Sequence, residues 1–111
     1  MRSTVSRLSV LVVGAMAILS VCLTAAATSR HTVTIKDMQY SPATIEVRVG
    51  DTVVWNNTDD RDHTVVADDG SFNSGNIRSG SSFSHTFAKA GSFAYGCKYH
   101  PRMRGTVVVK E

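Results

Sequence analysis

The sequence predicts an all-β protein, a sandwich of about seven to eight short strands in a single domain. Apolar and polar residues alternate with a period of two in several short runs. Clusters of Gly, Ser, Asn and Asp separate these runs, as expected for turns. No segment after residue 27 keeps the 3.6-residue apolar period of an amphipathic helix. With 111 residues the chain suits one small domain, and short strands joined by polar turns favour two packed sheets.

The expected strands follow one another along the chain after residue 31. They cover residues 32–35, 45–49, 52–56, 63–67, 81–87, 92–97 and 106–109. Residues 40–43 contain a proline and are expected to interrupt the first run. In the third run Val53 and Trp55 share one face, which places Trp55 in the core. Residues 68–80 are rich in Gly, Ser, Asn and Asp, and predict a long loop with little regular structure.

Residues 1–27 have the pattern of a secretory signal peptide. Arg2 and Arg7 precede an apolar run over residues 8–23, and three alanines at positions 25–27 provide a cleavage site. The apolar run is shorter than the roughly 20 residues of a membrane span. We therefore expect a periplasmic or otherwise exported protein whose mature domain is residues 28–111. Two alternatives remain open, a retained N-terminal membrane anchor or a lipid attached to Cys22.

Composition excludes some classes of function. Loss of the two signal arginines lowers the formal net charge from +3 to +1, and there is no basic stripe for nucleic acid. Removal of the signal also leaves Cys97 as the single cysteine. An exported chain with one cysteine has no internal disulfide, so this thiol is reactive, paired between chains or a metal ligand.

Three candidate metal ligands lie at a constant interval of three residues in one short segment. They are Cys97, His100 and Met103. A thiolate, an imidazole and a thioether are ligands that suit copper, and two histidines with one cysteine and a weak axial methionine describe a blue-copper electron-transfer site. Each has a simpler explanation: an inert buried thiol, a solvated loop histidine and a core methionine. The regular spacing favours ligation over all three.

A site of this type needs a second histidine from elsewhere in the chain. His63 is the best candidate because it follows a polar loop and begins a predicted strand, where a site at the end of a sandwich would lie. His85 shares a strand face with Phe83 and Phe87, which favours an inward, hydrogen-bonded ring. His31 lies near the mature N-terminus and would chelate copper only if cleavage followed Thr28.

These residues resemble the cupredoxins, and among them the amicyanin-like and plastocyanin-like small blue copper proteins. The resemblance covers nearly all of the mature chain. It rests on residues 42–45, 50–55, 63–65, 87–97 and 97–105. The two residues between His100 and Met103 are similar to the amicyanin interval. The sequence departs from the family pattern at Asp62, Thr64 and Tyr99, where proline, asparagine and proline are common; these changes are expected to tune the reduction potential.

The resemblance implies a Greek-key sandwich with one type 1 copper, Cu(I)/Cu(II), at one end. The ligands would be His63, Cys97 and His100, with Met103 axial. The protein would not be an enzyme but a monomeric electron carrier, with no membrane span after signal removal. Redox proteins of cytochrome or dehydrogenase type would dock transiently near His100.

The charges around the expected electron port predict the chemistry of these partners. Lys98, Arg102 and Arg104 form the tightest basic cluster of the chain, which favours an acidic docking face. The alternative is that they only keep the loop soluble.

Three other functions compete with electron transfer. A periplasmic copper store or copper-delivery protein would use the same ligands. A catalytic copper domain needs further histidines, and with His63 and His100 assigned only His31 and His85 remain, with no His-x-His pair. A metal-free adhesion sandwich would leave the Cys/His/His/Met set unexplained.

Overall fold

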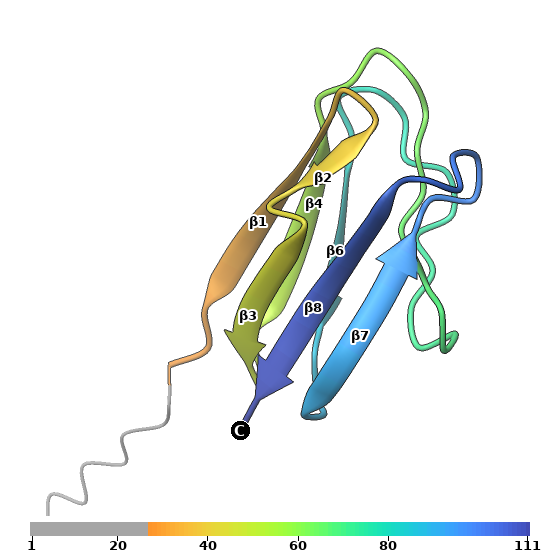
Figure 1. Cartoon of the computed structure of the whole chain (residues 1–111). Helices are drawn as coiled ribbons and strands as arrows, with labels where there is room; N and C mark the ends of the chain where they lie inside the picture. The colour runs from red at the N-terminus through yellow and green to blue at the C-terminus, as the bar shows by residue number, and fades with distance from the viewer. Residues whose placement is uncertain (1–26) are drawn as a thin grey trace, which may run out of the picture.

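The computed structural model describes residues 27–111, which form eight strands in two four-stranded sheets. The strands are β1 (Arg30–Lys36), β2 (Gln39–Ser41), β3 (Thr44–Arg48), β4 (Thr52–Asn57), β5 (Val66–Ala67), β6 (Ser82–Thr86), β7 (Gly91–Gly96) and β8 (Arg104–Lys110). One sheet has the order β2-β1-β4-β6, and the other has the order β3-β8-β7-β5. Figure 1 shows the two sheets facing each other. The predicted all-β sandwich is confirmed.

Two of the strand pairings are parallel and cross between distant parts of the sequence. β1 pairs with β4, and β3 pairs with β8, whereas the other pairings are antiparallel. Parallel neighbours cannot be joined by a tight hairpin, so the connections run over the ends of the sandwich. The loops after β4 and β7 therefore meet at one end, and the C-terminus lies at the other (Figure 1).

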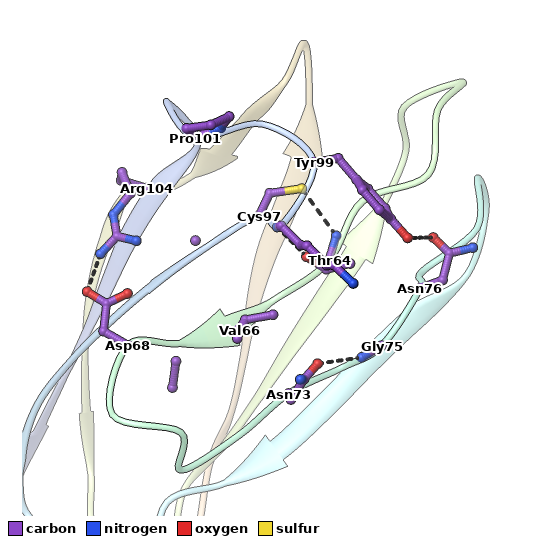
Figure 2. A pocket seen from close by; sticks show the side chains of 13 residues that line it. Thr64, Val66, Asp68, Asn73, Gly75, Asn76, Cys97, Tyr99, Pro101 and Arg104 are labelled. Carbon is purple, nitrogen blue, oxygen red and sulfur yellow. Dashed lines mark hydrogen bonds and ion pairs between the residues drawn. The ribbon is translucent and has the colours of Figure 1, made fainter.

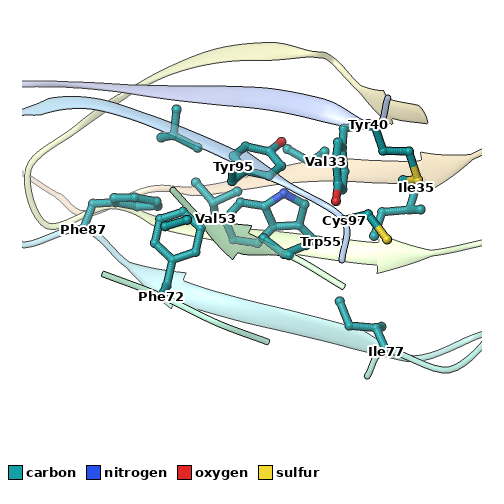
Figure 3. Close-up of a cluster of buried hydrophobic side chains, with 14 of the residues drawn as sticks. Val33, Ile35, Tyr40, Val53, Trp55, Phe72, Ile77, Phe87, Tyr95 and Cys97 are labelled. Atoms are coloured by element: carbon teal, nitrogen blue, oxygen red, sulfur yellow. The ribbon is translucent and has the colours of Figure 1, made fainter. Parts of the chain in front are cut away.

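The core lies between the sheets and reaches the end that carries these loops (Figure 3). Its apolar side chains include Val33, Ile35, Tyr40, Val47, Val53, Trp55, Val65, Phe72, Ile77, Phe87, Tyr95, Val107 and Val109. Trp55 is fully buried, as predicted, and its ring packs edge-on to that of Tyr95, with centroids 5.4 Å apart. Cys97 and Met103 belong to the same cluster.

Two local predictions differ from the structure. Residues 40–43 do not only interrupt the first strand, because Gln39–Ser41 turns back and pairs with β1 as β2. The 63–67 run is mostly not strand: only Val66–Ala67 joins β7, and His63 is held by an isolated bridge to Ile77. In both places backbone hydrogen bonds to a neighbouring segment decide the structure, which the alternation of side chains does not reveal.

The long loop over residues 68–80 lacks strands and helices, as predicted, but it is packed against the sandwich. Phe72 and Ile77 are buried in the core. The expected signal peptide, residues 1–27, lies outside the described residues apart from residue 27. Across residues 27–111 there is no helix with the length and apolarity needed to span a bilayer.

Candidate metal centre

His63 is positioned by the loop that follows β4. Its backbone forms a two-way bridge with Ile77, with His63 N donating to Ile77 O at 3.1 Å and Ile77 N to His63 O at 2.8 Å. The side chain is fully buried. Both features fix the ring against the end of the core rather than in solvent.

The turn between β7 and β8 carries the other predicted ligands. Cys97 directly follows β7, and the turn closes through Met103 N, which donates to His100 O at 2.9 Å. Cys97 N donates a second hydrogen bond, to Met103 O at 3.4 Å. A residue interval of three thus brings all three side chains to one tight turn.

The structure brings His63, Cys97 and His100 together. Their three ligand atoms all lie within 4.8 Å of one another. The sulfur of Cys97 is 3.9 Å from His63 Nδ1 and 3.6 Å from His100 Nδ1. His63 and Cys97 are buried and His100 is half-buried, so His100 is the member of the set nearest solvent. Within residues 27–111 this is the one such group of histidine, cysteine and acidic side chains.

Met103 is the fourth predicted ligand. Its side chain is buried, with only 2% of its surface exposed, and it lies near His63. It belongs to the core cluster that also contains Cys97. Ligation by its thioether stays a prediction.

The environment of Cys97 favours the thiolate, which is the form that binds metals. Burial of the sulfur opposes ionisation, but hydrogen bonds, the strongest of them from the Thr64 amide, outweigh it and lower the pKa of the thiol to about 6. The Thr64 amide donates to Cys97 Sγ at 3.4 Å (Figure 2). A buried, hydrogen-bonded thiolate beside two imidazoles is a donor set that fits copper.

Thr64 joins the two segments that carry the predicted ligands. Its amide bonds the sulfur of Cys97, and its hydroxyl accepts a hydrogen bond from Lys98 N at 2.7 Å. Its carbonyl accepts one from the hydroxyl of Tyr40 at 2.6 Å. Burial raises the pKa of Tyr40, so this phenol stays protonated and able to donate. The threonine that departs from the family pattern thus makes three contacts at the site.

Asp59 also contacts the site and was not anticipated from the sequence. Its Oδ2 lies 2.7 Å from His63 Nε2, the ring nitrogen that faces away from Cys97. The Met38 amide, and to a smaller extent His63 and the Asp37 amide, hold the pKa of this carboxyl below its usual range despite partial burial. The only sequence signal was an acid four residues before His63 in a polar loop, and such acids are common.

The other two described histidines lie outside the group. His31 pairs with Asp51 at the opposite end of the sandwich, with Nε2 and Oδ2 2.9 Å apart. The ring of His85 packs between those of Phe72 and Phe87, with centroids 4.9 and 4.8 Å away. The inward orientation of His85 is thus found with aromatic rather than hydrogen-bonded neighbours, and burial lowers its pKa.

The surface beside Cys97 is a shallow groove with charged and polar walls (Figure 2). Its lining includes Asn76, Tyr99 and Arg104, and the hydroxyl of Tyr99 donates to Asn76 Oδ1 at 3.3 Å. Arg104 forms an ion pair with Asp68. Of the predicted basic cluster, Lys98 and Arg102 are exposed, whereas the charge of Arg104 is compensated by this pair.

Comparison with known proteins agrees with this arrangement. Amicyanin from Paracoccus denitrificans is 36% identical over 83 residues, which cover 70% of this chain and 63% of that protein. This chain thus spans less than two thirds of the length of that relative.

Two solved structures have the same fold. A purple cupredoxin from Nitrosopumilus maritimus superposes with a TM-score of 0.67 and 31% identity, covering 72% of this chain and 99% of that one. A copper-containing nitrite reductase from Thermus scotoductus gives a TM-score of 0.70 with 28% identity, covering 74% of this chain but 22% of the enzyme.

The family model for the cupredoxin-like domain matches residues 9–109. That range includes both loops at the end of the sandwich and all four predicted ligands. Sequence, strand order and the cluster around Cys97 point in one direction, and the chain belongs to the cupredoxin-like family.

Proposed function

We propose that this chain is a type 1 copper protein that carries single electrons between redox proteins, and that His63, Cys97, His100 and Met103 hold its copper. The observation that carries the proposal is the convergence of a buried thiolate and two imidazole Nδ1 atoms within 4.8 Å at one end of the sandwich. Copper bound there would supply a one-electron couple between Cu(I) and Cu(II).

The chain's own residues would make this couple fast and specific. The turn closed by Met103 N and His100 O and the bridge between His63 and Ile77 hold the ligand segments before metal arrives. A prearranged site requires little movement when the charge of its metal changes. The apolar core lies behind Cys97, and half-buried His100 provides the route to solvent and to a partner.

This role is that of a carrier rather than of an enzyme. The nitrite reductase with the same fold is several times longer than the matching segment. His31 and His85 lie away from the cluster, so among the described residues neither extends it to a second centre. The predicted signal at residues 1–27 supports export to the periplasm and a mature domain of residues 28–111.

The electron partners would dock at the end that carries His100. Lys98 and Arg102 are exposed there, beside the exposed ring of Tyr99. An acidic docking face on a cytochrome or dehydrogenase would complement these charges, and the association rate would then fall as ionic strength rises. A monomer suits such transient contacts.

A spectroelectrochemical titration of the copper-loaded mature protein tests the proposal. We expect an intense copper–thiolate absorption with Cu(II) that disappears and returns through repeated one-electron cycles, with copper retained. Loss of copper on each reduction would favour a copper-delivery protein instead. A colourless protein that binds no copper would remove both functions.

A further inference from the structure

The carboxylate of Asp59 connects the candidate metal centre to the β1–β2 turn, which lies at the same end of the sandwich. Its Oδ1 accepts a hydrogen bond from Asp37 N at 3.0 Å and its Oδ2 accepts one from Met38 N at 3.1 Å. The same Oδ2 lies 2.7 Å from His63 Nε2. The side chain of Asp59 is 11% exposed, with its contact to buried His63 on one side and its contacts to the turn amides at the surface.

The turn that Asp59 holds is one that the sequence alone disfavours. Asp37 and Met38 form the two-residue connection between β1 and β2, and their φ angles are 52° and 58°. A two-residue hairpin turn with both φ values positive favours Asn, Asp or Gly at the first position and Gly at the second, because a side chain crowds the backbone there. Asp37 suits the first position, but Met38 does not suit the second. Two hydrogen bonds from the turn amides to one carboxylate offset part of that cost. The turn and Asp59 therefore fix each other in place.

Asp59 also determines how the ring of His63 is presented. An ionised carboxylate can only accept hydrogen bonds, so the hydrogen of a neutral His63 ring must lie on Nε2. Nδ1 is then left with a free lone pair, and this is the atom that faces Cys97 Sγ at 3.9 Å. The pair selects the tautomer that a metal requires, and it makes the ring more electron-rich.

We propose that Asp59 is a positioning residue for the metal centre, which it supports by anchoring the β1–β2 turn and holding His63 in its Nε2–H tautomer. The expected effect of Asp59 on metal binding rests on the proposed copper site. The structural part of the proposal concerns the metal-free protein and can be tested without copper.

Nitrogen NMR of the metal-free protein tests the structural part, at a pH where His63 is neutral. We expect the Nε2–H tautomer of His63 in the wild type. In Asp59→Asn, which keeps the side-chain volume but weakens the acceptor, we expect a mixture of tautomers and altered shifts of the Asp37 and Met38 amides. An Nδ1–H tautomer in the wild type, or unchanged spectra in the variant, would overturn the proposal.

Metal binding tests the functional part, with Co(II) and Cu(II) as the probes. We expect Asp59→Asn to lower the affinity for either ion by roughly 10-fold or more, the usual loss when a partner of a ligating histidine is removed. It should also raise the reduction potential, because a less electron-rich His63 favours Cu(I). The control is Asp60→Asn, which removes the same charge at an exposed neighbouring position.

The two variants separate a direct contact from a general charge effect. Equal losses of affinity in Asp59→Asn and Asp60→Asn would refute positioning through His63. If the wild type binds neither ion, the proposed copper function fails, whereas the NMR result on the tautomer still decides the role of Asp59. If Asp59→Asn does not fold, Asp59→Ala, which removes both carboxylate oxygens, replaces it in both measurements, with the same outcomes expected.

Discussion

The two ends of the sandwich each contain a histidine–aspartate pair. At the loop end His63 Nε2 lies 2.7 Å from Asp59 Oδ2, and at the opposite end His31 Nε2 lies 2.9 Å from Asp51 Oδ2. In both pairs the carboxylate also accepts two backbone amides, those of Asp37 and Met38 at Asp59, and those of Ser29 and Arg48 at Asp51. The local chemistry of the two ends is nearly the same.

The difference lies in the surroundings of the second ring nitrogen. His63 is fully buried, and its Nδ1 faces the sulfur of Cys97 with His100 beyond it. The side chain of His31 is 27% exposed, and it does not belong to any such group among the described residues. A histidine–carboxylate pair therefore indicates a metal site only when the free nitrogen meets other soft donors. At the far end the same pair fastens the start of β1 to the β3–β4 turn.

The largest effect should come from Cys97→Ser. The substitution replaces the soft thiolate by a weakly acidic hydroxyl, so the copper–thiolate absorption should vanish and Cu(II) affinity should fall by orders of magnitude. Absorption titration with Cu(II) measures both. Retention of the intense band in the variant would show that the sulfur of residue 97 is not its source.

A matched pair of variants tests the two ends directly. His63→Ala should abolish the blue absorption, whereas His31→Ala should leave its position and intensity unchanged, because of these two histidines only His63 belongs to the cluster. Cu(II) titration of both proteins at equal concentration is the measurement. Equal loss of colour in the two variants would contradict the distinction between the ends.

Met103→Leu should have a smaller effect at the loop end. Leucine has similar volume, so the core should remain packed, and three ligands should keep the absorption. Removing the axial donor disfavours Cu(II), so the reduction potential should rise. Cyclic voltammetry of the loaded variant checks this, and an unchanged or lower potential would exclude Met103 as the axial ligand.

The smallest effect should be at the far end, in Asp51→Asn. Hydrogen bonds from Ser29 N and Arg48 N, and then the contact with His31, lower the pKa of Asp51 to about 2. A folded-state pKa below the unfolded value of about 3.9 adds stability above that pH, and this contribution is lost as the pH falls towards about 2. Urea unfolding from pH 6 to pH 2 should show a weaker acid dependence in the variant, with unchanged copper colour. Parallel pH profiles of variant and wild type would contradict the assignment.

Much of the fold follows from the sequence because alternation with a period of two marks each half-buried strand. Val53 and Trp55 both point into the core, as their shared face predicts. The sequence does not predict the β1–β2 turn because Met38 stands where such a turn usually has glycine. The turn is stabilised by Asp59 from a distant segment, and the residues of the turn itself do not reveal such a contact.

The same reasoning applies to the site. The regular interval of Cys97, His100 and Met103 predicts that they share one site, and the loop position of His63 favours it over the other histidines. The roles of Asp59 and the Thr64 hydroxyl depend on how two loops meet across the end of the sandwich. Ligation by the four residues is a prediction that the titration above tests.

The bridge between His63 and Ile77 has a kinetic consequence. His63 and Ile77 exchange backbone hydrogen bonds. Residues 68–80 therefore cannot detach from the sandwich without breaking the bonds that hold the segment of His63. Escape of an ion from this end of the protein would then be governed by how often that irregular segment opens, since loops open locally more often than the whole domain unfolds. A stretch with almost no regular structure would thereby control how long an ion stays at the candidate metal centre.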